Sequence, residues 1–168
     1  MTEEKDAYPE QYRDHLEKMM GSFIPRILHL ENLMNDITSR HFSSGDERGV
    51  LFFYSLTPQM SFKKRIDMFL NMLRIHFNDI YRTYEKDLKK LHEIDDHRAH
   101  LEQRMLNITE NVLNNRDDRV QCTGSKNGKS FTRETDNKEH ERKIRLCSQV
   151  TTALKIIQSE IIFRAYHS

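Results

Sequence analysis

The sequence is constrained most by apolar side chains that return at every third or fourth position. The longest series of this kind lapses only at Arg98, and its members are Ile80, Tyr84, Leu88, Leu91, Ile94, Leu101, Met105, Ile108 and Val112. One face of an α-helix repeats with this period. The series predicts one very long helix over about 79–117, or two helices hinged near Asp95–Asp96. A pattern of this length is typical of a helix that packs against a partner helix.

Three further stretches share the helical spacing. They are Phe23, Ile27, Leu30, Met34, Ile37 and His41; then Phe62, Ile66, Phe69 and Leu73; and finally Ile144, Cys147, Val150 or Thr151, Leu154, Ile157 and Ile161. Asp46 and Ser61 each precede a helical stretch and are predicted N-caps, because their side chains accept hydrogen bonds from the first turn. Gly21–Ser22 is predicted to end a short first helix.

Together these segments predict a single all-α domain over residues 1–168, built as a four-to-five-helix bundle. Residues 1–21 form a short N-terminal accessory helix in this interpretation, and residues 22–165 form the bundle. Residues 119–136 lose the helical period. Asn127–Gly128 within them is a strong signal for a two-residue hairpin turn, so this stretch is predicted to be a polar loop or a small hairpin.

Composition restricts the partners and the compartment. An apolar fraction of 36% beside a charged fraction of 32% suits amphipathic helices with wide solvated faces, or a core completed by dimerisation. The net charge of +1 provides no overall field for nucleic acid or anionic membrane. No membrane-spanning run and no signal peptide is recognised, so the chain is predicted to be cytoplasmic and to have no membrane partner.

Histidines and carboxylates gather in one stretch of the longest apolar series. They are His92, Glu93, Asp95, Asp96, His97 and His100. Spacings of four residues place Glu93 with His97 and Asp96 with His100 on shared faces, a geometry that can hold a divalent metal. The preferred interpretation is an exposed face with charge pairing. No metal and no cofactor is therefore predicted. No glycine-rich phosphate loop, Ser/His/Asp arrangement or Cys-x-x-Cys pair is recognised.

The end of the longest series carries an arginine-rich turn, Asn114-Asn115-Arg116-Asp117-Asp118-Arg119. A local lattice of salt bridges that ends a helix is one interpretation. The functional alternative is that the guanidinium groups of Arg116 and Arg119 present forked donors to a phosphate. This turn is the predicted functional site.

The order of segments resembles the HEPN superfamily of small helical bundles. The resemblance rests on Ile27-Leu28-His29-Leu30-Glu31, Arg40-His41-Phe42, Leu51-Phe52-Phe53 and Met60-Ser61-Phe62-Lys63-Lys64-Arg65-Ile66-Asp67-Met68-Phe69-Leu70. A long helix ending at Arg116, a polar excursion and a closing amphipathic helix follow. The similarity covers residues 23–162 and implies a ribonuclease toxin or defence protein that acts as a homodimer, with RNA, a nucleotide or an antitoxin-like protein as its partner.

The resemblance also implies a site. Active members carry an arginine, a polar residue and, after four to six positions, a histidine that promotes attack of a ribose 2′-hydroxyl without metal. Arg116 and Asp117 match this pattern, but Gln121 stands in the histidine position and does not exchange a proton near neutral pH. Arg133 and His140 form a second match. The departure at Gln121 therefore favours a binding protein, with Arg116, Arg119, Gln121 and Arg133 as binding residues. The alternatives are a metal-independent endoribonuclease, using Arg116 and Asp117, or Arg133, with His140, and a purely structural bundle.

Overall fold

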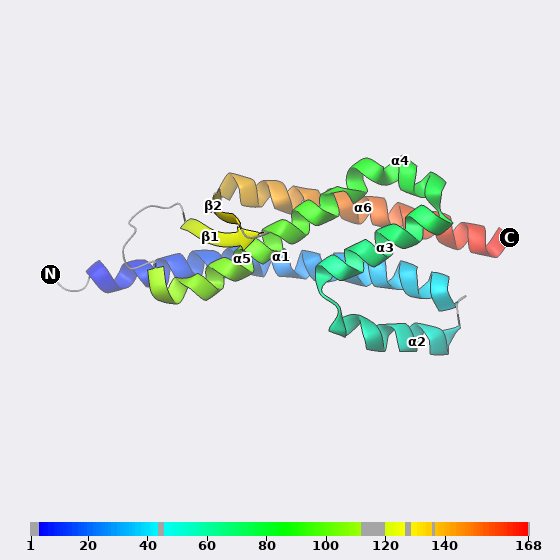
Figure 1. Ribbon diagram of the computed structural model, residues 1–168, viewed down its shortest axis with the longest axis horizontal. Helices are drawn as coiled ribbons and strands as arrows, with labels where there is room; N and C mark the ends of the chain where they lie inside the picture. Colours follow the sequence, from blue (N-terminus) through cyan, green and yellow to red (C-terminus); the bar gives the residue numbers. More distant parts are fainter. Residues whose placement is uncertain (1–3, 44–45, 112–119, 127–128, 136, 168) are drawn as a thin grey trace. The chain divides into compact units, whose positions relative to one another are not determined.

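The computed structural model describes residues 4–43, 46–111, 120–126, 129–135 and 137–167, with side chains described within 14–103 and 137–167 (Figure 1). The helices are α1 (Glu4–Ser43), α2 (Glu47–Leu56), α3 (Phe62–His76), α4 (Asn78–Leu88), α5 (Lys90–Asn111) and α6 (Asn137–His167), and a 3₁₀ turn spans Thr57–Gln59. Strands β1 (Val120–Lys126) and β2 (Lys129–Thr135) complete the described chain. The prediction of an all-α helical bundle is confirmed.

The chain divides into two compact units. The first comprises Met1–Pro25 and Asp96–Ile144, and the second comprises Arg26–Asp95 and Arg145–Ser168. Neither unit is a continuous piece of sequence, because α1, α5 and α6 each contribute to both. The single domain predicted over residues 1–168 stays a prediction.

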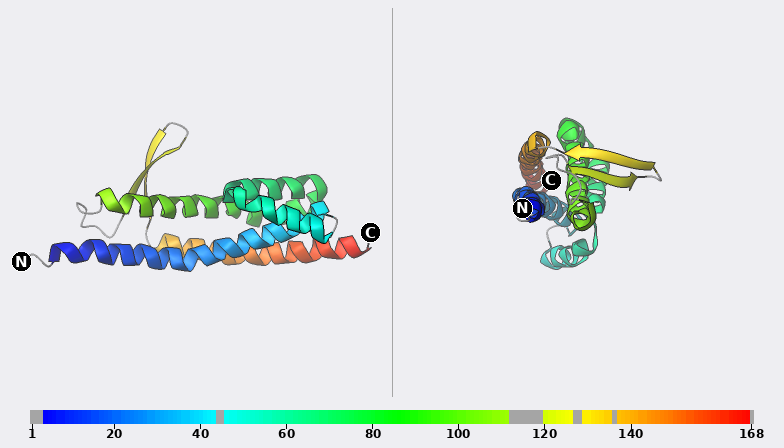
Figure 2. Two further views of the ribbon diagram at one scale, coloured as in Figure 1. Left: turned by 90° about the horizontal axis from the view of Figure 1, so that it is seen from below. Right: turned by 90° about the vertical axis from the view of Figure 1, so that its left-hand side faces the viewer.

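The described side chains of the first unit include as many buried polar residues as buried apolar ones. Among those described, the buried apolar residues are Leu16, Met19, Phe23 and Leu101, and the buried polar residues are His97, His100, His140 and Lys143. Strands β1 and β2 belong to the same unit and pair antiparallel, from Val120 opposite Thr135 to Lys126 opposite Lys129 (Figure 2). Of the two alternatives predicted for residues 119–136, the hairpin is the one observed.

Most of the buried apolar side chains that the structure describes belong to the second unit. The predicted stripes face inward: Ile27, Leu30, Met34 and Ile37 of α1, Phe62, Ile66, Phe69 and Leu73 of α3, and Cys147, Val150, Leu154, Ile157 and Ile161 of α6 are all buried. Both predicted caps are confirmed. Asp46 accepts a hydrogen bond from the Gly49 N–H at 3.1 Å, and Ser61 accepts one from the Lys64 N–H at 3.3 Å.

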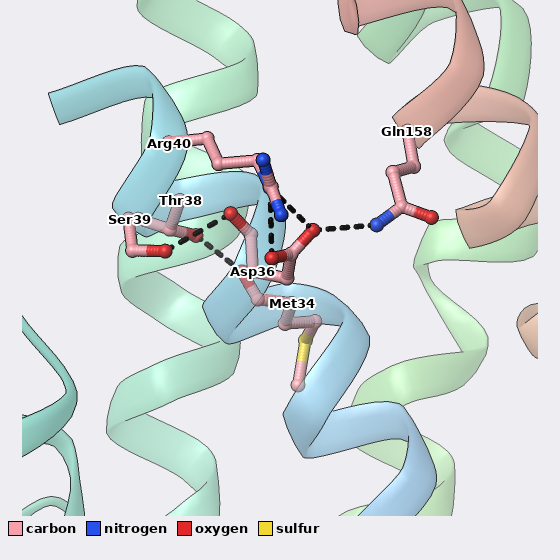
Figure 3. A network of polar contacts seen from close by, with 6 residues as sticks. All are labelled: Met34, Asp36, Thr38, Ser39, Arg40 and Gln158. Atoms are coloured by element: carbon pink, nitrogen blue, oxygen red, sulfur yellow. Dashed lines mark hydrogen bonds and ion pairs between the residues drawn. The ribbon is translucent and has the colours of Figure 1, made fainter. Parts of the chain in front are cut away.

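A polar contact joins α1 and α6 inside this unit (Figure 3). The Asp36 carboxylate accepts from the Arg40 Nε at 2.8 Å and from the Gln158 Nε2 at 2.6 Å. Thr38 and Ser39, buried on the same helix, donate to the backbone carbonyls of Met34 and Asp36. The buried hydroxyls are thereby satisfied without breaking the helix, since a bond to a preceding carbonyl keeps them local.

The prediction that Gly21–Ser22 ends a first helix, leaving an accessory helix over residues 1–21, is wrong. Helix α1 continues from Glu4 to Ser43. The cost of glycine in a helix interior is only about 1 kcal/mol, and the buried side chains of Leu16, Met19 and Phe23 continue the helical spacing across it. Pro25 consequently lies inside α1 rather than in the first turn of a new helix.

The very long helix predicted over about 79–117 is also corrected. The described segment is interrupted at Lys89, between α4 and α5, and α5 then runs through Asp95–Asp96 without a break up to Asn111. The Lys89 N–H bonds to the carbonyls of both Glu85 and Asp87. The backbone hydrogen-bond pattern of the helix is therefore disturbed at this one residue, and the apolar spacing continues across it. The longest described helices are instead α1, with 40 residues, and α6, with 31 residues.

Candidate functional site

The predicted arginine-rich site falls largely outside the described residues. Arg116, Asp117 and Arg119 lie there, so their convergence on a phosphate stays a prediction. Gln121 and Arg133 are described by their backbone alone: Gln121 lies in β1 opposite Glu134, and Arg133 lies in β2 opposite Cys122. Of the predicted site residues, His140 is the one whose side chain is described.

His140 lies in the first turns of α6 and is buried, with 7% of its surface exposed. Its Nε2 atom is 3.0 Å from the Oγ of Ser22 on α1. Its Nδ1 atom is 3.1 Å from the Nε2 of His97 on α5, which is fully buried. Three helical segments of the first unit therefore meet in one chain of hydrogen bonds that runs from Ser22 through His140 to His97. We call this chain the Ser22 network.

Phe23 forms the apolar wall of the Ser22 network. Its ring lies 5.0 Å from that of His97, nearly perpendicular at 87°, and 5.9 Å from that of His140. The imidazoles are thus held on one side by hydrogen bonds and on the other by an aromatic ring. Because hydrogen bonds are stronger away from water, and leaving a buried polar group unpaired is costly, this geometry fixes both rings in place.

The Ser22 hydroxyl sets the direction of the hydrogen bonds in the Ser22 network. It has one hydrogen, which it donates to the Met19 carbonyl at 2.8 Å. The Ser22 oxygen then accepts from His140 Nε2, which leaves His140 Nδ1 to accept from His97 Nε2.

Charged side chains lie directly beside His140 on α6. Glu139 accepts from Arg142 through both carboxylate oxygens at 2.9 Å, and its Oε1 is 3.2 Å from the Nζ of Lys143. These two cations, the Arg142 hydrogen bond first, lower the pKa of Glu139 from 4.5 to about 2. The side chain of Lys143 is 1% exposed, so the Glu139 carboxylate compensates an ammonium group that water scarcely reaches.

The predicted exposed face of paired charges on α5 is wrong in part. Asp95, His97 and His100 are buried, because the Ser22 network and the apolar spacing of α5 turn this face inward. His97 contacts His140 in the first unit, whereas the Nε2 of His92 is 3.7 Å from the Asp67 carboxylate in the second. Among the described residues, no three histidine, cysteine or acidic side chains are grouped so as to hold a metal ion.

Helix α2 is a second candidate, as a surface rather than a centre of chemistry. No residue of α2 is buried. Three of its large apolar side chains are exposed to solvent: Leu51 is 70% exposed, Phe52 is 66% exposed and Leu56 is 40% exposed. We call these three residues the α2 face. The helix lies at the edge of the second unit (Figure 1).

Helix α2 contacts the end of α1 near its first turn. A Cβ atom at Gly49 would lie 2.5 Å from the Cβ of Ser43, so the two helices touch where only glycine fits. Tyr54 is 36% exposed, and burial and the negative charge of Asp36 raise the pKa of its hydroxyl. Thr57, just after the helix, is buried. The helix is thus held at its two ends, while Leu51, Phe52 and Leu56 stay exposed.

The sequence alone predicted neither the Ser22 network nor the α2 face. Ser22 and His140 are separated by 118 positions, and Ser22 has the appearance of a helix cap beside Gly21. The one sequence signal for the α2 face is the uninterrupted apolar run of residues 50–54, in which no polar residue marks a solvated side.

Comparison with protein families, with curated proteins and with solved structures produced no match to this chain. A search of the described helices found none with the length and apolar character needed to cross a membrane.

Proposed function

We propose that the protein is a homodimeric binding protein whose two copies associate through the α2 face. The observation that carries this proposal is a helix with no buried residue that exposes Leu51, Phe52 and Leu56 together. A contiguous apolar patch on a soluble surface marks an interaction site more often than scattered apolar residues do. This is the binding role, rather than the cleaving role, within the resemblance to HEPN bundles.

A second copy of the chain suits the charges of α2. Its charged residues, Glu47 and Arg48, lie in the first turn, and the last turn carries no basic group. In an antiparallel pair about a two-fold axis, the first turn of each copy meets the uncharged last turn of the other. No side-chain charges of like sign then oppose one another.

The size of the α2 face sets the expected strength of the dimer. A standard interface takes roughly 800 Å² from each partner. Three side chains supply the apolar centre of such a contact but not its whole area. We therefore expect a dimer that dissociates at concentrations on the order of micromolar, in which Phe52 acts as the aromatic anchor.

The test is sedimentation or light scattering over a concentration series, comparing the wild type with Phe52→Lys. The variant is expected to be a monomer at concentrations where the wild type is dimeric. Ile75→Lys is the matched control, because Ile75 is 74% exposed on α3 and its replacement introduces the same charge elsewhere. A wild type that stays monomeric at high concentration, or a Phe52→Lys dimer as strong as that of Ile75→Lys, would contradict the proposal.

The endoribonuclease alternative is decided by a separate assay. In the structure both ring nitrogens of His140 contact protein side chains, which favours the binding role. RNA cleavage by the wild type is therefore expected to be absent. Cleavage that Arg116→Ala and His140→Ala both abolish would replace the proposed function with the nuclease, and binding of RNA without cleavage would assign RNA as a ligand of the dimer.

A further inference from the structure

We infer that His41 and His76 form an acid-sensitive contact, which holds the end of α1 against the corner between α3 and α4 and opens when both imidazoles are protonated. His41 lies in the last turn of α1 and His76 in the last turn of α3. Their ring centroids are 4.6 Å apart, with 53° between the ring planes. Two side chains of the kind that titrates near neutral pH therefore lie side by side where two helices meet.

Two phenylalanine rings complete this contact. The centroid of Phe42 lies 5.2 Å from that of His41 and 6.3 Å from that of His76. The ring of Phe77, the residue between α3 and α4, lies 5.0 Å from that of His41. Burial, and next the charge of His76, lower the pKa of His41. Both causes act against the protonated imidazole, so the contact resists a second charge.

The other charged groups on the surrounding elements form pairs of their own: Arg40 with Asp36 at 2.8 Å, Arg74 with the Tyr81 hydroxyl at 2.9 Å, and Asp79 of α4 with Arg164 of α6. On α2, the pKa of Tyr54 responds to Asp36 and Arg40. None of these groups shifts the pKa of His41, whereas His76 does. Within the part of the chain that the structure describes, no carboxylate pairs with either imidazole to offset its charge.

The contact accommodates one proton and opposes the second. A cation suits the C-terminal end of either helix because of the helix dipole. Two unit charges about 4.6 Å apart shift an equilibrium by a factor of about five even at the dielectric constant of bulk water. Because the pKa of His41 is lowered in the closed contact, the closed form is fully stable above pH 6.5 and loses stability as the pH falls below it.

Helix α2 is attached to the segment that this contact holds. Ser43 follows His41 by two residues, and its carbonyl accepts a hydrogen bond from the Asp46 N–H at 2.9 Å. Its Cβ also lies 2.5 Å from the position of a Cβ at Gly49. Opening the contact therefore displaces α2. If the proposed function holds, this displacement weakens the dimer, because the α2 face supplies only the centre of the interface and the neighbouring surface must stay aligned with it.

Hydrogen exchange of the α2 amides tests the contact without the dimer, in chains that all carry Phe52→Lys. At pH 5.5, exchange should be about five times slower when His76→Phe is added, because the ring stays and the second charge is removed. At pH 7.5 the two chains should exchange equally. Comparison at one pH cancels the intrinsic chemistry of exchange. His29→Phe, at an exposed histidine of α1, is the matched control and should leave exchange unchanged.

His76→Gln, which is also uncharged, replaces His76→Phe if that variant does not fold. Equal exchange with and without His76 at pH 5.5, or an equal effect of His29→Phe, overturns the acid-sensitive contact.

The dimer is tested separately, by sedimentation over a concentration series at pH 7.5 and 5.5. The dissociation constant of the wild type should rise about fivefold or more at pH 5.5, and that of His76→Phe should stay nearly constant. A wild-type dimer of equal strength at both pH values, or equal weakening of His76→Phe, overturns the regulation. A wild type that is monomeric at both overturns the proposed function and its regulation, while hydrogen exchange still decides the contact.

Discussion

Replacing Glu139 by Gln is expected to destabilise the first unit by about 2 kcal/mol, a value between the limits for surface and buried ion pairs. The side chain of Glu139 is 29% exposed, while that of its partner Lys143 is 1% exposed. Breaking a surface pair costs roughly 0–1 kcal/mol, and breaking a buried one costs roughly 3–5 kcal/mol. The fall in the pKa of Glu139 from 4.5 to about 2 corresponds to roughly 3 kcal/mol before solvent screening reduces it.

The pH dependence gives this prediction its sign. The folded-state pKa of Glu139 lies below its ordinary value, so the ionised carboxylate stabilises the fold above pH 4.5, and this contribution is lost as the pH falls through about 2. The difference between wild type and Glu139→Gln should therefore be full at neutral pH. It should shrink between pH 4.5 and 2.

Urea unfolding followed by circular dichroism measures the effect. A loss of about 2 kcal/mol moves the midpoint by about 1 M urea for a typical slope. Glu85→Gln is the matched control, because its partner Lys89 is 69% exposed and the pair is worth little. Adding Lys143→Met to Glu139→Gln should recover stability, since the buried cation then disappears. Equal losses at positions 139 and 85, or a double variant weaker than Glu139→Gln alone, would refute this reasoning.

Two further predictions concern glycine and cysteine. Gly21→Ala should stabilise α1 by up to about 1 kcal/mol, because a Cβ there meets nothing within 4 Å. Gly49→Ala should cost about 1–3 kcal/mol, because its Cβ would lie 2.5 Å from that of Ser43; thermal melts of the two variants that shift in the same direction would contradict this contrast. Burial raises the pKa of the Cys147 thiol to about 12, so Cys147 should resist alkylation at pH 8 in the folded protein and react once urea is added. Mass spectrometry measures the alkylation. Equal rates of Cys147 modification with and without urea would show that the thiol is accessible in the folded protein.

Periodicity predicted the core because burial depends on spacing that the sequence displays directly. Every stripe residue from Phe23 to Ile37 is buried, and the caps at Asp46 and Ser61 form the expected bonds. The break at Gly21–Ser22 was predicted wrongly because local propensity is worth about 1 kcal/mol, less than burying one large apolar side chain. Neighbouring segments, and not the glycine, decide whether α1 continues.

The candidate sites were harder to predict for a different reason. A contact between Ser22 and His140 depends on how α1 and α6 pack inside the first unit, and no local pattern encodes that pairing. Sequence spacing pairs His97 with Glu93, but it gives no sign of the contact that packing makes between His97 and His140. Helical spacing shows which residues share a face, but it does not show which helix that face meets.

The α2 face and the Ser22 network belong to different units, and this separation makes their roles independently testable. A charge at Phe52 alters the surface of the second unit, while Ser22 and both histidines lie in the first. Phe52→Lys should therefore abolish dimerisation and leave the loss of stability caused by Glu139→Gln in the first unit unchanged, because mutations with no shared partners usually act independently. A loss from Glu139→Gln that changes when Phe52→Lys is added would mean that dimerisation through the α2 face is coupled to the first unit.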